Sequence, residues 1–199
     1  MTKHRLELFS DGVFAIVLTL LVIDLRVPSA HGLGGLVEIL PALAVHAASF
    51  FIIGVFWHMH HGALARVVEI TSRTLLFNLV ALFWITLIPF GARLAAERPL
   101  EPLGASLVSL SCGAYLFSIM ATRLSAHSTI DDNPRTRAWR NRRVVLASTL
   151  ATSGLACAGL AWLSPWIGYA TSLAIVVIML LLPAPPDVEK QFELQAAEA

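Results

Sequence analysis

Six runs of mostly apolar residues, separated by short polar segments, dominate the pattern along the chain. A helix needs ~20 predominantly apolar residues to cross a bilayer, with a usable range of ~17–25. The runs have about this length, so we predict an all-α integral membrane protein with six transmembrane helices per subunit. Their approximate bounds are residues 6–25, 36–62, 75–94, 103–122, 144–163 and 166–182.

The composition supports this class. Apolar residues make up 57% of the 199 positions and charged residues 14%, and the mean hydropathy is +0.74. Soluble domains carry about 25% charged residues, so this balance excludes a disordered chain, a small secreted disulfide protein and an ordinary soluble enzyme. The net charge of +1 gives no reason to expect nucleic-acid binding. We expect a transmembrane domain at residues 1–183 and a short cytoplasmic tail at 184–199.

The basic residues are distributed unevenly between the two sides of the predicted membrane domain. Eleven of the 14 Lys and Arg residues fall at the N-terminus, in the loops after the second and fourth predicted helices, and in the C-terminal segment. The other three, Arg26, Arg93 and Arg98, fall on the opposite side. Short cytoplasmic loops are enriched in basic residues. We therefore predict that both termini are cytoplasmic, which also requires an even number of helices.

One acidic side chain lies well inside the first predicted helix. Asp11 is ~9 Å deep at 1.5 Å per residue, and an ionisable group at such depth is costly unless it has a partner. The second predicted helix returns to this depth at its end, and the third begins there. We predict a polar layer that clamps the first helix to the next two, formed by Arg5, Ser10, Asp11, Trp57, one of His58 or His61, and Asn78.

The histidines at the end of the second run suggest a metal site as an alternative. His58 and His61 are three residues apart and share a helix face, with His60 between them. Zinc sites need three or four ligands with defined spacing, and the sequence has neither a nearby Cys nor an HExxH pattern. We predict a hydrogen-bonding role for these histidines and no metal site.

A second pattern occupies the rest of the first run. Ile16, Thr19, Leu20 and Ile23 follow the spacing i, i+3, i+4, i+7, which places them on one helical stripe. Such a stripe is ordinarily a face that packs against another helix. The spacing alone does not indicate a pore.

The start of this helix resembles a known family. Arg5, Phe9, Ser10 and Asp11 form the pattern Arg-x-x-x-Phe-Ser-Asp, and Gly-Val-Phe-Ala-Ile and Thr-Leu-Leu-Val follow. The pattern is similar to the signature first helix of the transmembrane protein 175 family. Its members are potassium channels of bacteria, archaea and animal endosomes and lysosomes. The likeness extends over about residues 5–93 and includes Trp57 with His60 and His61, and the stretch from Asn78 to Pro89 and Phe90.

The resemblance implies a homotetramer in which the first helix of each subunit lines a central pore without a carbonyl selectivity filter. Ile16 would form the narrowest ring, with Leu20 and Ile23 further along, and Thr19 would favour potassium over sodium. Such an apolar constriction gates by dewetting and by diameter. The structural polar network inside each subunit would comprise Arg5, Phe9, Ser10, Asp11, Trp57, His61 and Asn78.

The resemblance also implies a passive, potassium-permeable cation channel in the inner membrane of a bacterium or archaeon, and not an enzyme. The expected partners are further copies of the chain, membrane lipid and permeant K⁺, without a cofactor or nucleic acid. A secondary transporter and a proton-leak pathway with the same fold are the alternatives. Transporters favour helices broken at mid-membrane, whereas the first predicted helix has no break, and Pro41 and Pro89 fall toward the ends of their spans.

Overall fold

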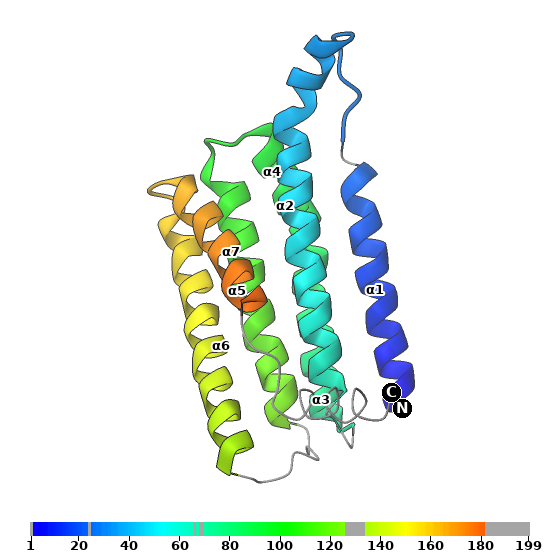
Figure 1. Ribbon diagram of the computed structural model, residues 1–199, viewed down its shortest axis with the longest axis vertical. Helices are drawn as coiled ribbons and strands as arrows, with labels where there is room; N and C mark the ends of the chain where they lie inside the picture. The colour runs from blue at the N-terminus through cyan, green and yellow to red at the C-terminus, as the bar shows by residue number, and fades with distance from the viewer. Residues whose placement is uncertain (1, 24, 66, 68–69, 126–133, 182–199) are drawn as a thin grey trace, which may run out of the picture.

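The computed structural model is all-helical and describes residues 2–23, 25–65, 67, 70–125 and 134–181, with the backbone alone for 134–140. Its helices run up and down along one common direction (Figure 1). The predicted tail at 184–199 lies outside the described residues. The helices are α1 Lys3–Ile23, α2 Leu33–Leu64, α3 Ser72–Thr86, α4 Ile88–Glu97, α5 Pro102–Ser125, α6 Pro134–Leu160 and α7 Pro165–Leu180.

The predicted membrane-spanning character is confirmed for the described residues. Five stretches are long and apolar enough to cross a bilayer, and α7 is a shorter apolar helix. At 16 residues, α7 is about 24 Å long, less than the ~30 Å hydrocarbon core. By contrast, the 32 residues of α2 extend over about 48 Å. The N-terminal end of α2 therefore projects beyond the rest of the bundle (Figure 1).

The third predicted span differs from the expected single helix. It consists of α3 and α4, which are separated at Leu87. Pro89 has no N–H, so a regular helix cannot continue through it, and Leu87 N donates to Trp84 O over 3.3 Å instead. Pro89 lies in the first turn of α4, in the last third of the stretch Ser72–Glu97.

Helix α5 is the centre of the bundle. It packs against α3, α4, α6 and α7, and also touches α2. Small residues allow this close packing: a Cβ on Gly113 would lie 2.7 Å from the Ala151 carbonyl oxygen of α6. Close approach of backbones through small residues is the usual way that membrane helices associate. The described helices of the bundle are therefore packed around α5.

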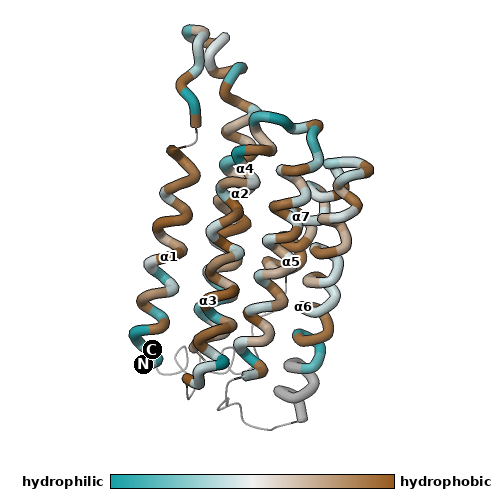
Figure 2. The backbone as a smooth tube through the Cα atoms, turned by 180° about the vertical axis from the view of Figure 1, so that it is seen from behind, coloured by the Kyte–Doolittle hydropathy of each residue, from teal (hydrophilic) through white to brown (hydrophobic). Residues whose placement is uncertain are grey.

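Helix α1 lies at the edge of the bundle in both views (Figures 1 and 2). It packs against α2 and α3, touches α4 slightly, and makes its contacts along one side only. Most of its length is apolar, with polar residues near its beginning (Figure 2). The other side of α1 is left uncovered by its own chain.

Candidate functional site

The first helix has a buried face and an exposed face. The buried face repeats about once per helical turn and consists of Leu6, Ser10, Phe14, Val17 and Leu21. These side chains enter the interior of the subunit, where Phe14 is 1% exposed. Helix α1 is thus attached to the bundle along this one line.

The stripe identified from its spacing lies on the exposed face. Ile16 is 61% exposed, Leu20 44% and Ile23 73%, and Thr19 is exposed as well. The ordinary interpretation, a face that packs within the subunit, therefore does not hold for the described residues. In a membrane protein such a face meets lipid, another subunit or a pore.

The hydroxyl of Thr19 is oriented by the backbone. Its Oγ1 donates to the carbonyl oxygen of Ile16 over 2.8 Å. Because this bond uses the only hydroxyl proton, the oxygen keeps its lone pairs for another partner. The outward stripe thus carries an oxygen acceptor among its apolar side chains.

On the inner half of α1, two neighbouring polar residues are bonded to two different helices. Asp11 Oδ1 accepts from Trp57 Nε1 of α2 over 2.9 Å. Ser10 Oγ accepts from Asn78 Nδ2 of α3 over 3.2 Å and donates to Leu6 O over 2.9 Å. Asn78 is fully buried. We call Ser10, Asp11, Trp57 and Asn78 the inner clamp, because they join α1 to both of its neighbours.

His60 is the histidine that enters the interior beside the inner clamp. It is 1% exposed, its ring lies 5.2 Å from that of Phe14, and it is close to Asn78. Tyr115 donates to Phe56 O over 2.8 Å and has its hydroxyl 3.4 Å from His60 Nδ1. His60 Nε2 and Asn78 Oδ1 are both buried and without a hydrogen-bond partner among the described residues. One is a potential donor and the other an acceptor, so the two atoms are chemically complementary.

The structure places the other predicted network residues elsewhere. Arg5 and Phe9 are exposed, and among the described ion pairs none joins Arg5 to Asp11. At 100° per residue, Arg5 and Phe9 continue the line of Ile16 toward the inner end of α1. His58 and His61 are also exposed. The ring of His61 stays near that of Trp57, with 6.3 Å between centroids.

Depth along the helix left open which of His58, His60 and His61 enters the interior, and the structure places His60 there. The sequence feature that points to His60 is helical periodicity. The buried face of α2 includes Ile53, Phe56, His60 and Leu64, at spacings of three and four residues. No group of three or more His, Cys, Asp or Glu side chains that could hold a metal occurs in the described part of the chain. The described contacts of His60 are ring packing against Phe14 and Tyr115 and a hydrogen bond with the Tyr115 hydroxyl.

Known proteins resemble this chain most in the region that carries both faces of α1. A family model described as endosomal/lysosomal potassium channel TMEM175 matches residues 5–89. A potassium channel of Chryseobacterium sp. (strain P1-3) is 38% identical over 120 residues, which cover 58% of this chain and 62% of that protein. The endosomal/lysosomal proton channel TMEM175 of Gallus gallus is 31% identical over 143 residues, which cover 62% of this chain and 28% of that protein. The chain thus spans less than two thirds of either relative.

A solved structure shares the fold over nearly the whole chain. The crystal structure of a lysosomal potassium-selective channel TMEM175 homolog from Chamaesiphon minutus matches with a TM-score of 0.65 and 25% identity, covering 90% of this chain and 96% of that one. The matched region from residue 5 to 89 contains the inner clamp and the outward stripe of α1. This multi-pass membrane protein is similar to TMEM175 channels over residues 5–89 and shares its fold with the Chamaesiphon homolog.

Proposed function

We propose that this protein is a passive, potassium-permeable channel whose pore is lined by the outward stripe of α1 in a homotetramer. The observation that carries the proposal is the exposure of Ile16, Leu20 and Ile23 on the side of α1 that its own subunit leaves uncovered. One chain supplies one such stripe, so a pore requires several copies around a common axis. Four copies are expected from the family resemblance.

The side chains of the stripe suggest how such a pore would conduct. From Ile16 to Ile23 the stripe extends ~10 Å along the axis. Rings of Ile and Leu cannot replace the hydration shell of an ion, so they would gate by dewetting and by diameter. Thr19 would contribute an oxygen with free lone pairs beside a partly dehydrated cation. Selectivity would then depend on the cost of removing water from the ion and on this oxygen.

The relatives support potassium as the permeant ion and make protons the second candidate. The Chryseobacterium relative is named a potassium channel and the Chamaesiphon homolog potassium-selective. The Gallus gallus relative is named a proton channel. We place the protein in the inner membrane of a bacterium or archaeon, with both termini cytoplasmic.

A secondary transporter is the alternative of a different class. The break at Leu87 within the third span removes one argument against it, because broken helices are common in transporters. Helix α1, however, is continuous from Lys3 to Ile23. The proposed pore helix therefore has no unwound segment of the kind that forms a transporter's binding site.

The proposal is tested by ion flux into liposomes that contain the purified protein. We expect flux down a potassium gradient, reduced when sodium replaces potassium, and a changed rate or selectivity in Ile16→Ala. Val22→Ala is the matched control: Val22 is also exposed but lies roughly 120° around the helix from Ile16. It should conduct like the parent protein.

Further measurements distinguish the channel from a transporter and from a proton pathway. Native mass spectrometry should give four subunits. Potassium flux that saturates and shows counter-exchange would support the transporter. Acidification of the liposomes without potassium movement would support the proton pathway. Unchanged potassium flux in Ile16→Ala would remove this residue from the pore.

A further inference from the structure

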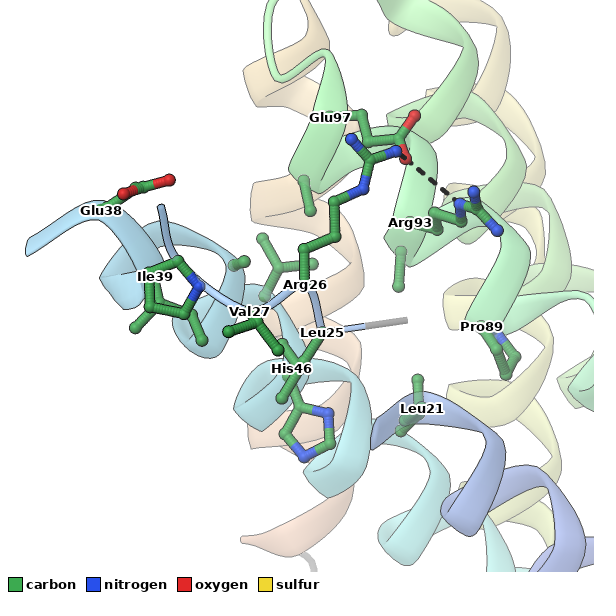
Figure 3. A pocket seen from close by; sticks show the side chains of 15 residues that line it. Leu21, Leu25, Arg26, Val27, Glu38, Ile39, His46, Pro89, Arg93 and Glu97 are labelled. Carbon is green, nitrogen blue, oxygen red and sulfur yellow. Dashed lines mark hydrogen bonds and ion pairs between the residues drawn. The ribbon is translucent and has the colours of Figure 1, made fainter. Parts of the chain in front are cut away.

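Beyond the buried side chain of Leu21, the end of α1 borders an open cavity. A cavity of about 250 Å³ opens there between the end of α1, the segment that follows it, α2 and α4. Its apolar walls include Leu21, Val45 and Pro89, and charged side chains stand at its rim (Figure 3). Unfilled space provides no contact atoms, so it contributes no dispersion energy that would hold the helix. The segment beyond Leu21 is held by polar contacts at the rim of this cavity.

An ion pair joins the segment after α1 to α4. Arg26 Nη2 lies 2.6 Å from Glu97 Oε1, across 71 positions of sequence. Arg93 Nε lies 3.2 Å from the same carboxylate oxygen. Figure 3 shows these three side chains together on one rim of the cavity. Glu97, near the end of α4, is thereby held by its own helix while it binds the segment after α1.

A second tie connects the same segment to α2. The carboxylate of Glu38 accepts from Ser29 N at 3.1 Å and from Ala30 N at 3.0 Å. Glu38 lies across the cavity from Arg26 (Figure 3). The segment after α1 is thus attached to α4 on one side and to α2 on the other, and both attachments are electrostatic.

We infer that Arg26 and Glu97 form an outer latch that positions the end of α1 and thereby sets the balance between closed and open pores. This inference rests on the proposed function for the location of the pore. Ile23, the last residue of both the stripe and α1, precedes Arg26 by three positions and is 73% exposed, so the latch lies directly beyond the end of the stripe. Because α4 restarts after the break at Leu87, a tilt of α4 about that break would reach α1 through the latch.

The interaction energy expected for the Arg26–Glu97 pair is small enough to shift the ratio of open to closed channels without unfolding the protein. The Arg26 side chain is 76% exposed and that of Glu97 33%, and exposed ion pairs are weak and screened by salt. Loss of the pair should therefore change the ratio of open to closed channels by roughly two- to fivefold, without unfolding the subunit. Arg26 and Glu97 act as positioning residues, since their effect on ions passes through α1.

The experiment combines three variants with two measurements. Arg26→Gln, Glu97→Gln and the double variant are compared with Arg98→Gln, which removes a local pair with Glu101 at 3.2 Å. Open probability is recorded from channels in planar bilayers. Spin labels at Leu25→Cys and Ala96→Cys, two positions on the cavity wall, report the spacing of α1 and α4. Cys112 and Cys157 are replaced by Ala, and labelled subunits are diluted with unlabelled ones.

We expect each single variant to weaken the dipolar coupling between the labels and to change the open probability. The double variant should change both quantities no more than a single variant does. Arg98→Gln should do neither. Unchanged coupling in Arg26→Gln would overturn the latch, as would additive effects in the double variant. A changed spacing with unchanged open probability would overturn its role in gating. A parent protein that does not conduct would count against the proposed pore, while the labels would still report the latch.

Discussion

The two faces of α1 are alike in sequence and opposite in surroundings. One carries Phe14, Val17 and Leu21, which are at most 4% exposed, and the other carries Ile16, Leu20 and Ile23, which are 44% exposed or more. Both consist of large apolar residues at helical spacing. Lipid and protein interior are both apolar, so hydrophobicity cannot distinguish a face that packs from one that does not. The difference arises from the partners that each face meets.

The largest effect should come from the buried face. Phe14→Ala removes a buried ring. The centroid of this ring lies 5.2 Å from that of the His60 ring and 6.5 Å from that of the Tyr115 ring. Truncation of a buried Phe costs about 3–5 kcal/mol in soluble proteins, and the loss of packing contacts applies in a membrane as well. We expect a strongly lowered melting temperature of the purified protein in detergent.

The matched control for Phe14→Ala is Phe51→Ala. Phe51 lies on α2 and is 65% exposed, so its truncation leaves no internal cavity. Its melting temperature should stay close to that of the parent. Equal losses in the two variants would mean that burial within the chain does not determine the cost of truncating these rings.

The next effect should come from the inner clamp. Asp11→Ala removes the acceptor that Trp57 Nε1 uses at 2.9 Å, which frees α1 from α2 at this level. A hydrogen bond to a charged group contributes about 1.5–3 kcal/mol. We expect loss of the tetramer on size-exclusion chromatography, and loss of flux in the protein that remains.

Glu7→Ala is the control for the clamp, since it removes an acid of the same helix. Glu7 pairs with Lys3 at 3.9 Å near the end of α1, where exposed pairs contribute little. Trp57→Phe keeps an aromatic ring at this position but removes the indole N–H donor, and its effect should resemble that of Asp11→Ala in direction. A stable, fully active Asp11→Ala channel would show that the clamp does not control the position of α1.

Sequence reasoning succeeded where one rule applied and failed where partners had to be chosen. The length and hydropathy of the runs were enough to predict a bundle of membrane helices, because the bilayer sets these directly. Depth counting suggested Asn78 and Trp57 as companions of α1, and the structure places them beside Ser10 and Asp11. Depth does not fix which side of a helix a residue faces, so Arg5, Phe9 and His61 were assigned to the network although they are exposed.

Contacts between segments that are distant in the chain could not be predicted from the sequence. The pair of Arg26 and Glu97 joins segments 71 residues apart, and no local pattern indicates that pairing. The break at Leu87 has a visible cause in Pro89. Its consequence, a separate helix α4 that carries Glu97 to the end of α1, requires the arrangement of the whole third span.

The smallest effect should come from Thr19, on the exposed face. Thr19→Val keeps the shape of the side chain and removes the oxygen that donates to Ile16 O at 2.8 Å. Because Thr19 is exposed, the melting temperature should not change. If its lone pairs contact a partly dehydrated cation, loss of an interaction of about 0.5–1.5 kcal/mol lowers the potassium-to-sodium permeability ratio roughly two- to tenfold. Reversal potentials under mixed-ion conditions measure this ratio directly. Thr19→Ser, which retains the oxygen, should preserve it, and an unchanged ratio in Thr19→Val would leave selectivity to the apolar rings alone.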